Sequence, residues 1–204
     1  DLARIHKETG KPVDLEQIFK LATVREIAKF ISQAEEKAYV PIPKLPVKEF
    51  YPASPAQKRI FILDKLMECA YNYNMPTVLE LSGNVETQGI KTALSKLIER
   101  HELLRTCFEV LGDEIVQRIS TDVKFELLYK EIDSNDLEEA IKNSIKPFNL
   151  GKAPLFRAIL FKTEKEQMYL FMDIHHIIFD GSSKAILFDE FLKLYNGELL
   201  GEKN

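Results

Sequence analysis

The sequence has few of the features that would tie a protein to a membrane, a nucleic acid or a disulfide framework. It contains two cysteines, Cys69 and Cys107, without CxxC spacing. Because both lie among apolar neighbours, we expect reduced core thiols in a cytoplasmic protein. Lys and Arg total 28 against 32 Asp and Glu, so no positive excess favours nucleic acid as a partner. No apolar stretch approaches the ~20 residues that a membrane helix needs, so no membrane partner is expected.

The start of the chain lacks two further features. Asp1 is not an initiator Met, and no apolar signal region follows it. We therefore expect residue 1 to be a cut inside a larger polypeptide. Hydrophobic residues make up 45% of the chain and charged residues 29%, a balance typical of a folded globular protein.

The first 36 residues have the apolar spacing of three short helices. Thr23 followed by Glu26 is the pattern of a capping box at the start of the third helix. Three helices of this size are too few to close a core alone. Alternating prolines in residues 37–49 predict an extended linker, the clearest domain boundary in the sequence.

From residue 50 onward, helices and strands alternate with short connections. Ser54 followed by Gln57 is a capping-box pattern for the first of these helices. The interleaving predicts an α/β fold, a two-layer sandwich with a mixed sheet. The expected helices span 54–67, 86–101, 134–145 and 182–195, and the expected strands span 77–81, 103–110, 115–119, 125–129, 155–162 and 167–175.

Two of the four histidines are neighbours, in the run His175-His176-Ile177-Ile178-Phe179-Asp180-Gly181 at the end of the last expected strand. Adjacent strand residues point to opposite faces, so one His faces a given cavity and the other is free for a structural role. A His at a strand end can act as a general base, while Asp180 fixes the turn through a cation or backbone donors. Gly181 permits a tight turn and offers its amide to a developing oxyanion.

The same residues are open to plainer interpretations. An isolated His pair is more often a buried, hydrogen-bonded pair than a catalytic one. A zinc site has weaker support, because His6 and His101 have no Cys or carboxylate at ligand spacing, and no metal is expected. No GxSxG elbow surrounds Ser54, Ser182 or Ser183, so these serines are interpreted as helix caps.

Three segments together resemble the condensation domains of nonribosomal peptide synthetases. Residues 54–63, SPAQKRIFIL, are similar to the first motif of that family, and residues 100–108, RHELLRTCF, match the second. Residues 175–181, HHIIFDG, match the third, the His-His-x-x-x-Asp-Gly motif of the active site. Taken alone, the charges of the second segment would be solvated groups near a helix end. Three motifs in order make the resemblance specific.

The resemblance covers residues 50–204 and implies one lobe, the N-terminal one, of a chloramphenicol-acetyltransferase-like fold. It implies an acyltransferase that forms a peptide bond, in which His176 positions or deprotonates an acceptor amine as it attacks a carrier-bound thioester. The lobe alone is expected to be inactive, since the second lobe would follow Asn204. The other residues to which the resemblance gives supporting or framework roles are His175, Asp180, Gly181, Arg59, Arg105, Ser54 and Gln57.

The first 36 residues resemble the second half of a peptidyl carrier protein, in segments 4–11 and 21–28. By that resemblance, the serine that bears phosphopantetheine would precede Asp1, so the cofactor would sit on partner carriers and not within this chain. The partners implied are donor and acceptor carrier domains, the C-terminal lobe of the same condensation domain and an adjacent adenylation domain.

Alternatives to condensation stay open. An epimerization domain shares the third motif but removes and returns an α-proton, and the first motif argues against it. A heterocyclization domain would carry Asp at the position of His175. The segment could also be a non-catalytic docking or folding module. Ser182 stands where Trp or Val is common, so the resemblance does not fix whether the donor is an L- or a D-amino acid.

Overall fold

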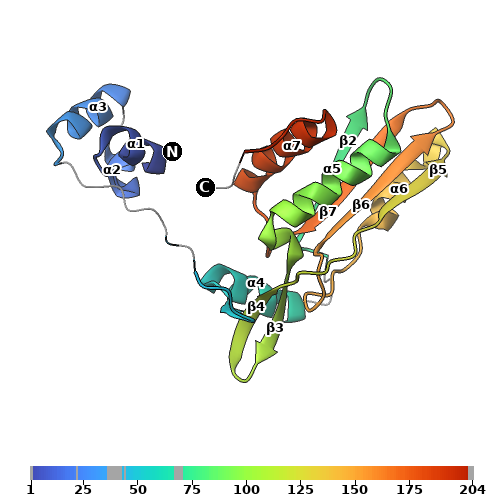
Figure 1. Ribbon diagram of the computed structural model, residues 1–204, viewed down its shortest axis with the longest axis horizontal. Coiled ribbons are helices and arrows are strands. Elements are labelled where there is room, and N and C mark those ends of the chain that lie inside the picture. The colour runs from blue at the N-terminus through green and yellow to red at the C-terminus, as the bar shows by residue number, and fades with distance from the viewer. Residues whose placement is uncertain (1, 22, 36–42, 44, 67–70, 202–204) are drawn as a thin grey trace. The chain divides into compact units, whose positions relative to one another are not determined.

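A computed structural model describes residues 2–21, 23–35, 43, 45–66 and 71–201 of the chain (Figure 1). It divides into two compact units, residues 1–47 and 48–204. Cys69, the end of the helix expected at 54–67 and most of the proline-rich linker lie outside the described residues. None of the described helices combines the length and apolar character that crossing a membrane demands.

The first unit consists of three short helices, α1 (Leu2–Thr9), α2 (Leu15–Lys20) and α3 (Val24–Gln33). α3 begins with the expected capping box, in which the Thr23 hydroxyl accepts from the Glu26 amide at 3.3 Å and the Glu26 carboxylate accepts from the Thr23 amide at 3.1 Å. Phe19 and Val24 are 81% and 84% exposed. As expected, the three helices leave large apolar side chains uncovered.

The second unit is built on a mixed four-stranded sheet with the order β2-β7-β6-β5 (Figure 1). Strands β2 (Asn74–Leu81), β7 (Met168–His175) and β6 (Phe156–Thr163) are antiparallel neighbours, and β5 (Leu127–Ile132) runs parallel to β6. β2 is an edge strand, so it tolerates Pro76, which has no amide hydrogen for the ladder. The expected α/β fold with a mixed sheet is confirmed, but helices pack on both faces of this sheet rather than forming the expected two layers.

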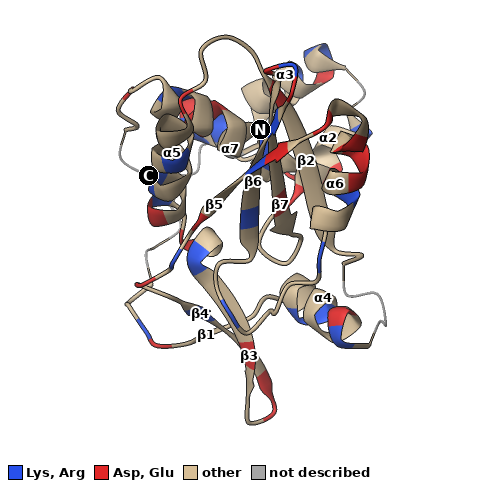
Figure 2. Ribbon diagram, turned by 90° about the vertical axis from the view of Figure 1, so that its right-hand side faces the viewer, with Lys and Arg blue, Asp and Glu red and all other residues tan. Residues whose placement is uncertain are grey.

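Helices α5 (Thr87–Arg100) and α7 (Gly181–Tyr195) pack on one face of this sheet, and α6 (Leu137–Ser144) packs on the other. The charged residues of α6 are exposed, and they appear as coloured segments of its ribbon in Figure 2. Alternate residues of β6 and β7 meet the apolar faces of α5 and α7 in the main core, which includes Leu94, Leu97, Ala158, Leu160, Leu170, Met172, Leu187 and Phe191.

A second, smaller sheet has the order β1-β4-β3, with β1 (Tyr51–Pro52), β4 (Glu114–Ile119) and β3 (Thr106–Leu111). Helix α4 (Pro55–Leu66) follows β1 in the chain. The expected capping box starts this helix. The Ser54 hydroxyl accepts from the Gln57 amide at 3.2 Å, and the Gln57 side-chain oxygen accepts from the Ser54 amide at 2.8 Å.

Three expected strands have wrong bounds. The strand expected at 77–81 begins three residues earlier and is Asn74–Leu81. Residues 103–105 belong to a short 3-10 helix, Glu102–Arg105, because the Thr106 hydroxyl donates to the Glu102 carbonyl at 2.7 Å and closes the turn. The strand expected at 125–129 is Leu127–Ile132. Phe125 does not pair with β6 but stacks on the ring of Phe156, with ring centroids 5.5 Å apart.

A buried polar cluster joins three strands of the main sheet. Asp173 of β7 accepts a hydrogen bond from the Asn74 side chain at 2.7 Å, and Arg157 Nε lies 3.4 Å from the same carboxylate oxygen. The other oxygen of Asp173 is buried and has no partner among the described residues. Burial raises the pKa of Asp173 to about 6, although Arg157 and Asn74 act in the opposite direction.

We predict that Asp173 makes the protein less stable as the pH rises from about 4 to about 6. The folded-state pKa of about 6 lies above the unfolded value of ~3.9, so the folded state binds the proton more tightly. This stabilisation is complete below pH ~4 and is lost as the pH passes the folded-state pKa. Urea unfolding of wild type and Asp173→Asn at pH 4 and pH 7 should reveal a relative change on the order of 1 to 3 kcal/mol. If the free energy of unfolding of the two proteins had the same pH dependence, the raised pKa of Asp173 would be contradicted.

A second prediction concerns neighbouring residues of α7. Leu187 is 6% exposed and packs in the main core, whereas Ile186 is 58% exposed. Leu187→Ala should lower the free energy of unfolding by about 2–5 kcal/mol, because it removes buried methyl groups and leaves a cavity. Ile186→Ala, the matched control, should change it by about 0.5 kcal/mol or less. Equal losses in denaturant titrations would mean that α7 does not pack through this face.

Candidate functional site

The two neighbouring histidines have opposite environments. His175 is the last residue of β7 and is fully buried, whereas His176 begins the following turn and is exposed. The His176 amide donates to the Tyr73 carbonyl at 2.8 Å, and the Ile178 amide donates to the His175 carbonyl at 3.1 Å. The chain therefore turns at the end of the strand and presents one imidazole to solvent while it retains the other inside.

The exposed ring of His176 is held in one tautomer. Its Nδ1 lies 2.7 Å from the carbonyl oxygen of Phe179. Because a carbonyl oxygen only accepts, we assign the ring proton of the neutral imidazole to Nδ1. Nε2 is then left with a lone pair, the arrangement that a hydrogen-bond acceptor or general base requires.

The buried ring of His175 has the complementary arrangement. Its Nδ1 accepts from the Ile177 amide at 3.1 Å, and its Nε2 lies 3.4 Å from a carboxylate oxygen of Asp64 on α4. Burial lowers the pKa of His175, although Asp64 acts in the opposite direction. The ring is therefore neutral at pH 7, with its proton on Nε2 facing Asp64. Among the described residues, no group of three or more His, Cys, Asp or Glu is placed to hold a metal ion.

Asp180 caps α7. One of its carboxylate oxygens accepts from the Ser183 amide at 2.8 Å and from the hydroxyls of Ser183 and Ser182 at 2.7 Å and 2.8 Å. These bonds, those from Ser183 first, lower the pKa of Asp180 to about 2. The expectation that Ser182 and Ser183 cap this helix is wrong, because both hydroxyls donate to the carboxylate that caps it. We expect Asp180 to pair with a cation or with backbone donors. Among the described residues, the backbone donor is the Ser183 amide.

Gly181 is the first residue of α7, and its backbone is not in the left-handed region. A Cβ atom built there would meet nothing within 4 Å. The tight turn expected at Gly181 therefore does not depend on glycine. Its amide belongs to the first turn of the helix, where amides lack intrahelical acceptors.

The residues of the second motif connect elements of the fold. Arg105 donates to the carbonyl of Ile98 at 3.1 Å and to that of Ser120 at 2.9 Å. Arg100 Nε lies 3.2 Å from Glu190 of α7, and His101 Nε2 contacts the same carboxylate. Burial acts to raise the pKa of Glu190. Hydrogen bonds and charge from His101 and Arg100 outweigh this effect and lower that pKa. The expectation of solvated charges is wrong for Arg100 and His101, which connect α5 to α7.

The first motif contributes to the site through a residue that the sequence analysis did not single out. Ser54 and Gln57 form the cap of α4, and Arg59 is exposed. Asp64, on the same helix, is 7% exposed and faces His175. A carboxylate three residues after the buried Phe61 is the signal that could have revealed it, since such spacing places both on one helix face.

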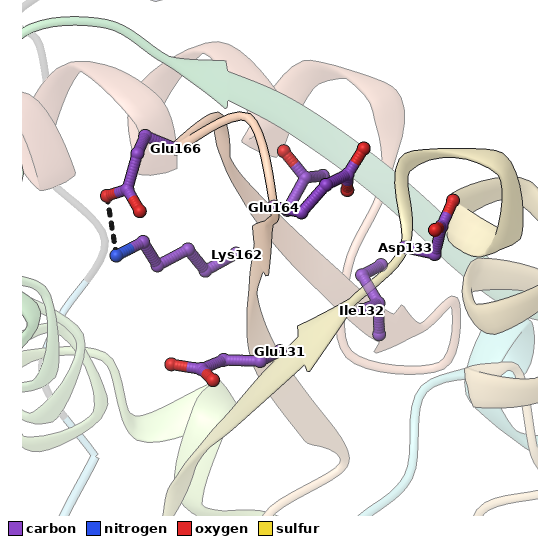
Figure 3. Close-up of a pocket in the computed structure, with 7 residues that line it drawn as sticks. Glu131, Ile132, Asp133, Lys162, Glu164 and Glu166 are labelled. Carbon is purple, nitrogen blue, oxygen red and sulfur yellow. Dashed lines mark ion pairs between the residues drawn. The ribbon is translucent and has the colours of Figure 1, made fainter.

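A surface pocket lies away from these residues. Its lining residues come from the ends of β5 and β6 and the following loops, and they are Glu131, Ile132, Asp133, Lys162, Thr163, Glu164 and Glu166 (Figure 3). Lys162 pairs with Glu166 at 2.6 Å. β7 starts near this pocket and ends at His175, and its eight residues span about 23 Å. The pocket is therefore separate from the histidine turn.

Removal of the α7 cap provides a test of this geometry. Asp180→Ala should lower the free energy of unfolding by about 1 kcal/mol at pH 7, and Asp180→Asn, which retains a capping oxygen but lacks the charge, should cause a smaller loss. The folded-state pKa of about 2 lies below the unfolded value of ~3.9, so the carboxylate stabilises above pH ~4 and its contribution is lost as the pH falls through 2. Denaturant titrations at pH 7 and near pH 2 measure this. If Asp180→Ala lowered the free energy of unfolding as much at pH 2 as at pH 7, the lowered pKa of Asp180 would be contradicted.

Comparison with known sequences gives long matches to very large proteins. Bacitracin synthase 3 of Bacillus licheniformis is 40% identical over 198 residues, which cover 97% of this chain and 3% of that protein. Gramicidin S synthase 2 of Aneurinibacillus migulanus is 37% identical over 201 residues, which cover 98% of this chain and 4% of that protein. The chain thus spans about 3 to 4% of the length of these two relatives.

Solved structures share the fold. The starter condensation domain of rhizomide synthetase RzmA superposes with a TM-score of 0.68 at 23% identity, over 76% of this chain and 40% of that one. The X-domain in its complex with OxyB from teicoplanin biosynthesis gives a TM-score of 0.71 at 22% identity, over 78% and 36%. The expected condensation-domain fold is confirmed. Residues 47–204 also match the family model described as "Condensation domain", and the chain belongs to that family.

Proposed function

We propose that residues 50–204 form the N-terminal lobe of a condensation domain in a nonribosomal peptide synthetase. The relatives are synthases of bacitracin and gramicidin S, and the matched structures are covered to about 40% or less. The observation that carries the proposal is the exposed imidazole of His176, held by Phe179 so that Nε2 has a free lone pair.

In the proposed reaction, the amine of an acceptor aminoacyl thioester attacks the carbonyl carbon of a donor thioester. The C–N bond forms and the C–S bond breaks, so the donor acyl group passes to the acceptor amine and the arm of the donor carrier leaves as a thiolate. Nε2 of His176 accepts the proton that the amine loses, and this proton passes to the departing sulfur. Because amines attack thioesters readily, orientation of the two tethered substrates contributes much of the rate.

Both substrates would be delivered on phosphopantetheine arms of donor and acceptor carrier domains, loaded by an adenylation domain. We propose that residues 1–36 are the tail of such a carrier domain. The uncovered apolar side chains of α2 and α3 fit a piece that needs a further helix. Ser32 donates to the Lys29 carbonyl from within α3, so it does not offer the helix-start serine that would carry the arm.

Substitution of His176 tests the function. In a protein that continues this chain through the rest of the condensation domain, His176→Ala should lower dipeptidyl-thioester formation by about 10²–10⁴-fold if Nε2 accepts the proton. His176→Gln supplies an amide near Nε2 that cannot accept a proton, so a rate near wild type for this variant would indicate positioning instead. Mass spectrometry of loaded carriers measures the product, and amide spectra of each variant verify folding.

The same assay tests the alternatives. The 204-residue chain alone should give no product, because the proposed second lobe would be missing. Deuterium exchange at the donor α-carbon without amide formation would move the assignment to epimerization. Full activity of His176→Ala would contradict the proposed role of the histidine turn.

A further inference from the structure

We propose that Asp64 is a positioning residue for His176 and that it acts through the buried imidazole of His175. The inference rests on the proposed function, since it concerns the group that would receive the amine proton. Asp64 lies on α4 and His176 lies after β7, and the two are linked by a chain of contacts rather than by direct contact.

The first step of this chain is the turn itself. The peptide groups on both sides of His176 are held by their amide hydrogens. The His176 amide donates to the Tyr73 carbonyl at 2.8 Å, and the Ile177 amide donates to Nδ1 of His175 at 3.1 Å. The ring of His176 is fixed at a third point by the Phe179 carbonyl. Loss of the Ile177 contact would free one of the two peptide groups that aim the exposed ring.

The second step is the tautomer of His175. Its Nδ1 can accept from Ile177 only while the ring proton is on Nε2. The carboxylate of Asp64, 3.4 Å from Nε2, favours that proton position. Without Asp64, the proton is free to move to Nδ1, where it would oppose the Ile177 amide. A doubly protonated His175 ring would also be unable to accept from the Ile177 amide. Burial lowers the pKa of this ring and so disfavours the doubly protonated form.

The third step is the placement of Asp64. Phe61 is 6% exposed and anchors the inner face of α4, and Asp64 lies one turn further on that face with 7% exposure. A carboxylate buried without a partner would be strongly unfavourable. Tyr73 and Phe148 flank the His175 ring at 6.2 Å and 6.0 Å between centroids. The ring is thus enclosed by aromatic groups, and Asp64 is the acceptor that Nε2 faces.

Two substitutions separate the role of Asp64 from general stability. Asp64→Leu keeps the branched shape of the side chain and removes the acceptor, whereas Asp64→Asn retains an oxygen that can accept from Nε2. Asp173→Asn is the matched control, since it alters a buried carboxylate of the same unit that contacts Arg157 and Asn74. If Asp64→Leu does not fold, Asp64→Ala, which also removes the acceptor and is smaller, takes its place in both readouts.

The first readout is the tautomer in the 204-residue chain, measured from long-range ¹H–¹⁵N correlations of the imidazole rings. Wild type and Asp64→Asn should show His175 with its proton on Nε2. Asp64→Leu should show a mixture or the Nδ1 form. An unchanged Nε2 form in Asp64→Leu would overturn the proposal. This readout does not depend on activity, so it can fail or succeed separately from the proposed function.

The second readout is amide formation by the complete condensation domain. Asp64→Leu should lower kcat by about 10- to 100-fold with little change in the KM for the acceptor carrier. The reason is that the His176 ring is misoriented while substrate binding is unaffected. Asp64→Asn should retain most of the wild-type kcat, and the kcat of Asp173→Asn should remain within about twofold of wild type. In a His176→Ala background, Asp64→Leu should have no further effect. A loss no greater than that of Asp173→Asn, or full additivity with His176→Ala, would overturn the proposal.

Discussion

The rest of the site depends on the two contacts made by the buried imidazole of His175. This residue ends the central strand β7 and joins a helix of the first motif to the turn of the third, because it faces Asp64 through one nitrogen and the Ile177 amide through the other. Burial keeps this ring neutral, which preserves both contacts. The neighbouring His176 is exposed on a turn whose backbone is held by Tyr73 and His175.

A second constraint fixes the helix that follows the turn. Asp180 accepts from the Ser183 amide in the first turn of α7, and Glu190 of the same helix pairs with Arg100 of α5 and with His101, which follows α5. The second and third sequence motifs thus meet across the packed pair α5 and α7, which lies on the main sheet (Figure 1). Ile177 and Ile178 of the histidine turn belong to the same main core as this pair and strands β6 and β7, so packing holds the turn in place.

Local patterns were enough to predict much of this fold. The capping boxes at Ser54 and Thr23 each depend on residues close in sequence, and so does the turn that begins at His176 directly after β7. Contacts between distant segments were not predictable in the same way. The Asp64 contact to His175 bridges 111 positions, and periodicity alone does not show which strand a helix faces. The same holds for the pairing of β5 with β6, which shifted that strand from its expected bounds.

In their neutral forms, the two neighbouring imidazoles carry the ring proton on different nitrogens, His175 on Nε2 and His176 on Nδ1. Long-range ¹H–¹⁵N correlation spectra of the wild-type chain near pH 7.5 report both tautomers directly. The structure predicts one ring of each kind, with the Nε2 of His176 unprotonated and open to solvent. Spectra in which both rings carry the same tautomer, or in which the proton of His176 lies on Nε2, would contradict the account.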